Sequence, residues 1–82
     1  MRVTVLYFAA VRDLVGKDEE ALSLPDGVAS IAAIGDHLAR LHLGLEGRLG
    51  YVRFARNEEF AQPTDPIADG DVIALIPPVA GG

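Results

Sequence analysis

The 82-residue chain has no cysteine, and Lys17 is its only lysine. Without cysteine, the protein has no disulfide bond, no thiolate ligand for a metal and no cysteine nucleophile of its own. The chain also lacks a run of about 18 apolar residues that could span a membrane, and no basic and then apolar leader opens it. We therefore expect a soluble, cytoplasmic protein that has no membrane partner.

Positive charge is scarce as well. Seven basic residues stand against twelve acidic ones, giving a net charge of −5. This balance disfavours nucleic acid as a partner and favours docking on a basic protein surface. Apolar side chains, in contrast, make up 50% of the residues. A domain of this size buries only about 60% of its unfolded surface, so we expect most large apolar residues to point into a single core.

Alternating apolar residues predict a set of short strands. The first strand should lie centrally in its sheet with much of both faces covered, and the second should pair with it in antiparallel fashion. The last strand is a continuous apolar run, which is typical of a strand buried between neighbours. The expected strands cover residues 2–8, 19–24, 51–56, 60–61 and 72–76.

One helix is expected with particular clarity. Ser30 is a candidate N-cap, and the apolar residues that follow recur at intervals of 3, 4 and 3, which places them on one stripe. Gly35 within this helix suggests the close approach of another backbone. A shorter helix or turn should cover residues 10–15 and end at Gly16. The predicted stripe consists of Ile31, Ile34, Leu38 and Leu41.

The order of these elements predicts an α+β domain of the β-grasp, or ubiquitin-like, type. About five strands would form a mixed sheet over one main helix, with the first and last strands parallel in the middle. A split βαβ arrangement has a similar order of elements, so the order alone does not decide between them. We expect the domain to cover residues 1–75 and a flexible diglycine tail to cover residues 76–82.

No self-contained active site is evident in the sequence. Asp65, Asp69 and Asp71 do not have the spacing of a calcium loop and indicate a plain turn. His37 and His42 are five residues apart, do not share a helix face and lack a third ligand, so we expect solvated histidines and no metal site. No glycine motif matches a nucleotide-binding loop, and no serine has a suggestive histidine and acid. We expect no bound cofactor.

The last residues are the most informative part of the chain. Pro77 and Pro78 would stiffen the exit from the domain, while Gly81 and Gly82 carry no side chains. The only reactive group there is the α-carboxylate of Gly82, so such an end could enter a narrow slot in another protein. A frayed terminus is the alternative interpretation, because chain ends are commonly disordered.

Two segments resemble the small subunit of molybdopterin synthase, a family of ubiquitin-like sulfur carriers. They are residues 5–16, which include Phe8 and Arg12, and residues 69–82, which end in Pro-Pro-Val-Ala-Gly-Gly. The similarity extends over essentially the whole chain. Its two ends are specific, whereas the loop at residues 42–50 and the stretch at residues 56–60 could take many sequences on the same scaffold.

The resemblance implies a sulfur carrier that is a non-catalytic subunit. An E1-like activating enzyme would adenylate the terminal carboxylate with ATP, and a cysteine desulfurase or rhodanese-type protein would supply sulfur. The resulting thiocarboxylate would enter the large synthase subunit and donate sulfur to cyclic pyranopterin monophosphate (precursor Z), which forms the molybdopterin dithiolene. The implied site residues are Gly82 as the sulfur acceptor, Pro77, Pro78, Val79, Ala80 and Gly81 for tail insertion, and Phe8 and Arg12 for the subunit contact.

Two other functions stay open at this point. Carriers for thiamine synthesis or tRNA thiolation share the expected fold and the diglycine, but usually lack the Pro-Pro-Val run. A ubiquitin-like modifier would instead join Gly82 to lysines of target proteins, and a binding module would have an inert tail. With Lys17 as the only lysine, chains built by the protein on itself would have a single linkage.

Overall fold

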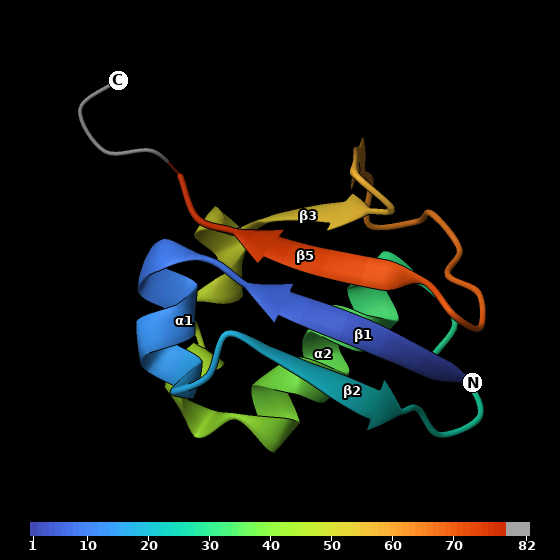
Figure 1. The fold of residues 1–82 in the computed structure, drawn as a ribbon, viewed down its shortest axis with the longest axis horizontal. Coiled ribbons are helices and arrows are strands. Elements are labelled where there is room, and N and C mark those ends of the chain that lie inside the picture. The colour runs from blue at the N-terminus through green and yellow to red at the C-terminus, as the bar shows by residue number, and fades with distance from the viewer. Residues whose placement is uncertain (79–82) are drawn as a thin grey trace.

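The structure, a computed structural model, describes residues 1–78 as a five-stranded sheet with one main helix across it (Figure 1). None of the helices in this described part is long and apolar enough to cross a membrane. The elements are β1 (Arg2–Tyr7), α1 (Ala9–Val15), β2 (Glu19–Ser23), α2 (Ile31–Leu41), the 3₁₀ turns η1 (Leu43–Leu45) and η2 (Leu49–Tyr51), β3 (Arg53–Arg56), β4 (Glu59–Ala61) and β5 (Val72–Ile76).

The strand order is β2-β1-β5-β3-β4. β1 and β5 run parallel at the centre, with Thr4 opposite Val72 and Tyr7 opposite Leu75. The other pairs, β1 with β2, β3 with β5 and β3 with β4, are antiparallel. This arrangement confirms the predicted β-grasp fold with its mixed sheet. The short edge strand around Phe60 is also confirmed.

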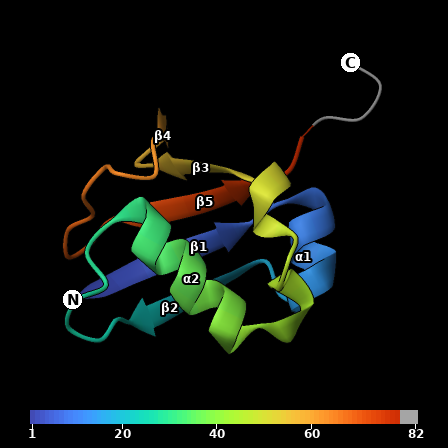
Figure 2. The same ribbon diagram turned by 180° about the vertical axis from the view of Figure 1, so that it is seen from behind.

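Helix α2 covers one face of the sheet, as Figure 2 shows from behind. The Ser30 hydroxyl accepts a hydrogen bond from the Ala33 amide at 3.2 Å, which confirms the predicted N-cap. The stripe residues Ile31, Ile34 and Leu38 are buried in the core. The expectation for Leu41 is wrong, since its side chain is 48% exposed. The helix ends at this residue and the chain turns into η1, so the stripe loses its contact with the sheet.

Two further details differ from the sequence-based expectation. The expected close backbone at Gly35 is wrong, because the near neighbour is the side chain of Phe54. A Cβ added at Gly35 would lie 3.4 Å from the Phe54 ring. The segment between α2 and β3 is more than an open loop, because its two 3₁₀ turns place Leu45 in the core with no exposed surface. Since η2 extends to Tyr51, β3 begins two residues later than predicted.

The predicted cover on both faces of β1 is complete on one face and only partial on the other. Val3, Val5 and Tyr7 are buried beneath α2, whereas Leu6 on the opposite face is only half-buried. Among the described residues, no helix packs on this outer face (Figures 1 and 2). Helix α1 lies at the end of the sheet where β1 and β5 both terminate. Its C-cap at Gly16 has φ 87°, which confirms the predicted helix end.

Candidate functional site

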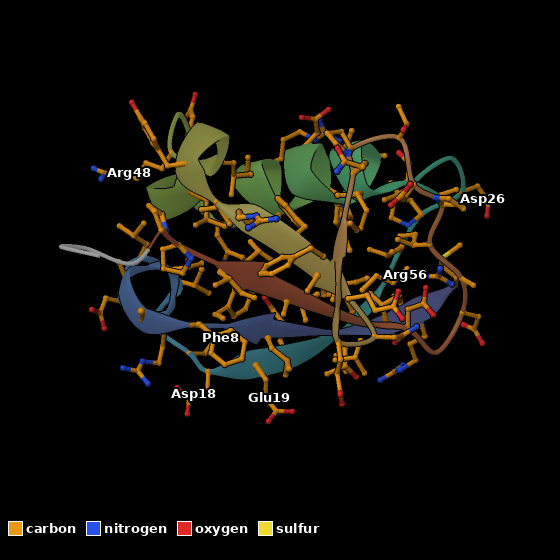
Figure 3. All side chains as sticks on the ribbon, turned by 90° about the horizontal axis from the view of Figure 1, so that it is seen from above. Phe8, Asp18, Glu19, Asp26, Arg48 and Arg56 are labelled. Atoms are coloured by element: carbon orange, nitrogen blue, oxygen red, sulfur yellow. The ribbon has the colours of Figure 1, made fainter. Side chains whose placement is uncertain are left out.

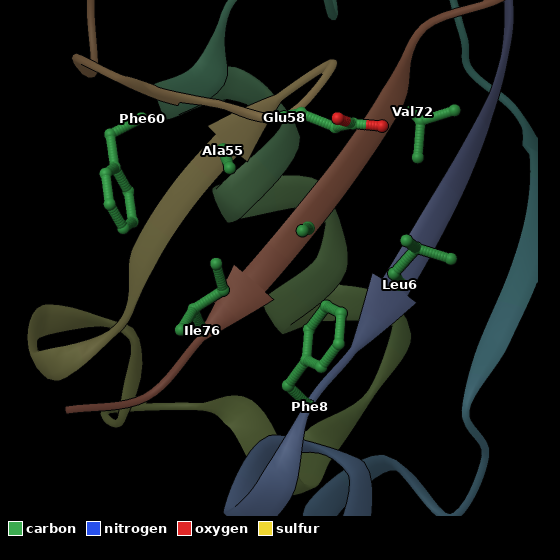
Figure 4. Close-up of a pocket in the computed structure, with 8 residues that line it drawn as sticks. Leu6, Phe8, Ala55, Glu58, Phe60, Val72 and Ile76 are labelled. Carbon is green, nitrogen blue, oxygen red and sulfur yellow. The ribbon is translucent and has the colours of Figure 1, made fainter. Parts of the chain in front are cut away.

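The open face of the sheet contains an apolar hollow of about 230 Å³. Its floor lies where Ala74 of β5 pairs with Leu6 of β1 on one side and with Ala55 of β3 on the other. The two alanine side chains are small, so larger neighbours stand above them and form the rim (Figure 4). The lining residues are Leu6, Phe8, Ala55, Glu58, Phe60, Val72, Ala74 and Ile76.

Two aromatic residues of the rim are unusually accessible. Phe60 is 59% exposed and Phe8 is 46% exposed. The Arg53 guanidinium carbon lies 3.8 Å from the centre of the Phe60 ring, a cation–π contact that orients this ring on the edge strand. Exposed apolar patches with aromatic anchors are typical of protein interaction sites. This face therefore has the character of a docking surface.

The junction between β1 and α1 fixes the position of Phe8. Its amide donates to the Leu75 carbonyl at 3.3 Å, and its own carbonyl accepts from the amides of Val11 and Arg12. Phe8 is thus exposed and lines the hollow, which is compatible with its predicted role in a subunit contact. That subunit contact stays a prediction. Arg12 does not line the hollow. Its side chain is exposed and lies 3.8 Å from the Asp18 carboxylate, so its predicted role also stays a prediction.

The tail begins beside the hollow. Ile76 is both the last residue of β5 and a lining residue, and Pro77 and Pro78 follow it directly. Pro77 is half-buried and Pro78 is exposed. Because β1 and β5 are parallel, this exit lies at the same end of the sheet as Phe8. The predictions for Val79, Ala80, Gly81 and Gly82, and for the flexibility of the tail, fall outside the described residues.

A buried carboxylate supports the far end of the hollow. Asp71 is 6% exposed and accepts hydrogen bonds from Arg56 Nε at 2.5 Å, Asn57 Nδ2 at 3.0 Å and the Ala68 amide at 2.7 Å. The Arg56 guanidinium and these two donors lower the pKa of Asp71 from 3.8 to about 2. Asn57 also accepts from the Val72 amide at 2.9 Å. Asp71, predicted as part of a plain turn, therefore ties β5 to the β3–β4 turn.

A second polar cluster joins β1, β2 and the end of α2. The Glu20 carboxylate accepts a hydrogen bond from the Tyr7 hydroxyl and lies 2.5 Å from His42 Nε2. Burial by itself would raise the pKa of Glu20, but the contacts with Tyr7 and His42 outweigh burial and lower it. Burial and the Glu20 contact raise the pKa of Tyr7. The prediction of a solvated His42 is wrong, because its side chain is 15% exposed.

Neither cluster resembles a catalytic or metal site. Within residues 1–78, no group of three or more histidine and acidic side chains could hold a metal ion. Glu20 and Asp71 have their hydrogen bonds satisfied inside the domain, and no buried side-chain polar atom in this part of the chain lacks a partner. These contacts, and the places of Phe60 and Glu58 in the lining of the hollow, were not anticipated from the sequence. The exposed aromatic residue on a three-residue edge strand was the signal that could have found the hollow.

The fold and this surface define a ubiquitin-like β-grasp domain that presents a chain segment beside an apolar sheet face. Comparison with known sequences is more specific. The model of the ThiS family matches residues 5–82, and the chain belongs to this family.

Its relatives include the molybdopterin synthase sulfur carrier subunits of Chlamydomonas reinhardtii and Escherichia coli. The first is 37% identical over 84 residues, with 100% of both chains covered. The second is 38% identical over 86 residues, with 98% of this chain and 99% of the relative covered. These similarities agree with the resemblance noted in the sequence.

Solved structures show the same fold. The Haloferax volcanii small archaeal modifier protein 1 superposes with a TM-score of 0.83 at 28% identity, covering 95% of this chain and 98% of that one. The complex of subunits 1 and 2 of the Helicobacter pylori molybdopterin-converting factor contains a chain with a TM-score of 0.70 at 26% identity, and both chains are covered completely.

Proposed function

We propose that this chain is the sulfur carrier subunit of molybdopterin synthase. The observation that carries the proposal is the end-to-end similarity to sulfur carrier subunits, which includes the tail region through residue 82. The geometry of the described residues supports it. The central strand β5 ends at Ile76 on the rim of an apolar docking face and passes directly into the Pro77–Pro78 pair.

The proposed chemistry takes place at Gly82. A carboxylate is a poor electrophile, so an activating enzyme first transfers AMP from ATP to it and releases pyrophosphate. A persulfide sulfur from a cysteine desulfurase or rhodanese-type donor then attacks the acyl carbon and displaces AMP. Reductive cleavage of the resulting acyl disulfide by a thiol leaves the thiocarboxylate. The chain cannot carry out the first step alone, because its carboxylate has no leaving group until it is adenylated.

In the next step the loaded tail enters the large synthase subunit. The thiocarboxylate donates its sulfur to cyclic pyranopterin monophosphate, and hydrolysis returns Gly82 to a carboxylate. We assign the apolar face around Phe8 and Phe60 to docking on that subunit. The related chain of the Helicobacter pylori protein occurs in a complex of the two subunits. Gly81 and Gly82 have no side chains, which would allow the tail to enter a narrow active site.

Mass spectrometry of the intact chain tests the proposal. The chain is incubated with an activating enzyme, ATP and a sulfide source, and the expected product has sulfur in place of one oxygen of the Gly82 carboxylate. A variant with one alanine added after Gly82 should lose sulfur transfer while its thermal melt stays unchanged. Full activity of that extended variant would rule out the terminal mechanism. High mass accuracy is needed, because oxidised Met1 has nearly the same mass increase.

The second candidate is a protein modifier, and the similarity to the small archaeal modifier protein favours it. A modifier would form an isopeptide bond between Gly82 and a lysine. On a second copy of this chain that lysine would be Lys17, whose ammonium lies 3.4 Å from Glu20. Adducts on lysines in the same incubation would support the modifier, whereas oxygen-to-sulfur exchange without adducts supports the carrier.

A further inference from the structure

Glu58 is the one charged side chain among the eight that line the apolar hollow. Figure 4 shows its carboxylate reaching from the β3–β4 turn toward Val72 on β5. The other lining residues offer only apolar surface, with Phe60 on one side of the hollow and Leu6 on the other. A single negative charge therefore lies at the rim of a surface that is otherwise suited to apolar contact.

The turn that carries Glu58 is held in an uncommon conformation. Asn57 and Glu58 both have positive φ, 50° and 72°, which suits the two-residue hairpin turn but is unusual for a glutamate. Contacts with β5 stabilise it: the Asn57 amide donates to the Val72 carbonyl at 2.9 Å, and Asn57 Nδ2 donates to the buried Asp71. Residues kept in sparsely populated conformations often serve a function. Here the constraint fixes the backbone from which the Glu58 side chain extends over the hollow.

Glu58 has no ion pair or side-chain hydrogen bond with another residue in the described range 1–78. The cations nearby are engaged elsewhere. The Arg53 guanidinium stacks on the Phe60 ring, and Arg56 is bound to Asp71. When a protein covers the hollow, the Glu58 carboxylate loses water on that side, and a buried charge without a partner is costly. A covering surface that supplies a cation would remove this cost.

We propose that Glu58 selects the docking partner by pairing with a lysine or arginine that the partner's otherwise apolar surface presents. This inference rests on the proposed function, in which the large synthase subunit covers the face. The ion pair contributes to the affinity for the correct partner. It also disfavours other proteins, because a surface without a cation leaves the Glu58 carboxylate desolvated and unpaired. The occupant is thus an apolar patch with one basic residue at the edge that meets the β3–β4 turn.

The test compares Glu58→Gln and Glu58→Lys with the unchanged chain in titrations against the large subunit from the same organism. Both substitutions keep a long side chain without β-branching, so they bear the same backbone strain as glutamate at this position. Glu46 provides the matched control. It is exposed beside α2, on the covered side of the sheet. Glu46→Lys changes the net charge by the same amount as Glu58→Lys.

At low salt we expect affinity to fall about fivefold for Glu58→Gln and at least about 20-fold for Glu58→Lys. Glu46→Lys should stay within about twofold. Raising the salt concentration should weaken binding of the unchanged chain more than that of Glu58→Gln, because only the former has the ion pair. A purely structural role for Glu58 would not produce this difference in salt dependence.

Phe60→Ala separates failure of this inference from failure of the docking assignment. If Phe60→Ala weakens binding while both Glu58 variants bind normally, the face is the docking site and the selective role of Glu58 is refuted. If none of the three variants changes affinity, the large subunit binds elsewhere and both assignments fail. Equal loss in Glu58→Lys and Glu46→Lys would show that only net charge matters, which also overturns the inference.

Discussion

Replacing Asp71 with asparagine should destabilise the domain in a manner that depends on pH. The carboxylate accepts three hydrogen bonds, from Arg56, Asn57 and the Ala68 amide, and they lower its pKa from 3.8 to about 2. A difference of one between the folded and unfolded pKa values corresponds to about 1.4 kcal/mol of free energy. The ionised carboxylate therefore contributes roughly 2 kcal/mol to the free energy of unfolding at pH 7.

The sign of the pH dependence follows from the lowered pKa. Because the folded value lies below the unfolded one, near 3.9, the contribution of Asp71 is complete above that pH. It is lost progressively as the pH falls toward 2, where the folded protein also takes up the proton. Asparagine cannot ionise, so the difference between Asp71→Asn and the unchanged chain should be greatest at neutral pH and should shrink in acid.

Urea unfolding at a series of pH values between 7 and 2.5 measures this difference directly. A loss of roughly 2 kcal/mol corresponds to a melting temperature lower by about 8 to 16 °C for a domain of this size. Asp26→Asn is the control, because Asp26 lies in the exposed turn after β2 and takes no part in the hydrogen bonds of Asp71; Figure 3 labels both Asp26 and Arg56. A neutral-pH loss below about 0.5 kcal/mol, or a loss that persists unchanged at pH 2.5, would refute the assigned role of Asp71.

Two further variants probe the packing and the tail. Gly44→Ala should lower the free energy of unfolding by about 1 to 3 kcal/mol, because its Cβ would lie 2.6 Å from the Leu14 carbonyl oxygen. Gly50→Ala is the control and should be nearly neutral, because its Cβ would have no atom within 4 Å. Equal stability of the two variants in urea unfolding would contradict the close packing at Gly44. Gly81→Val should block sulfur transfer without changing the thermal melt, and normal turnover by this variant would show that the slot of the large subunit is wider than we propose.

The main elements of the fold were predictable because their signals are local or periodic. Ser30 and the apolar stripe behind it define α2, and Gly16 marks the end of α1 through its positive φ. The apolar run of β5 indicated a central strand, which the parallel pairing with β1 confirms. Leu41 shows the limit of such a pattern, since periodicity alone does not reveal where the sheet beneath a helix ends.

Most of the apolar hollow could not be predicted, because apart from Phe60 on the short edge strand its apolar lining residues look like core residues. Leu6 and Ile76 belong to strands whose inward and outward side chains are both apolar, so alternation does not distinguish the covered face from the open one. The Asp71 network was hidden for a different reason. Its partner Arg56 lies 15 residues away in the sequence and comes close only through the pairing of β3 with β5.

The position of β5 also bears on how the protein folds during synthesis. This strand is nearly the last part of the domain to leave the ribosome, yet it lies between β1 and β3 and joins the two antiparallel pairs. Before it is inserted, β2–β1 and β3–β4 have no common sheet, and non-local pairing of this kind forms late. A truncated chain that lacks β5 would lack both the completed hollow and the exit at Ile76. Only the fully folded chain therefore has the apolar hollow and the exit at Ile76 side by side.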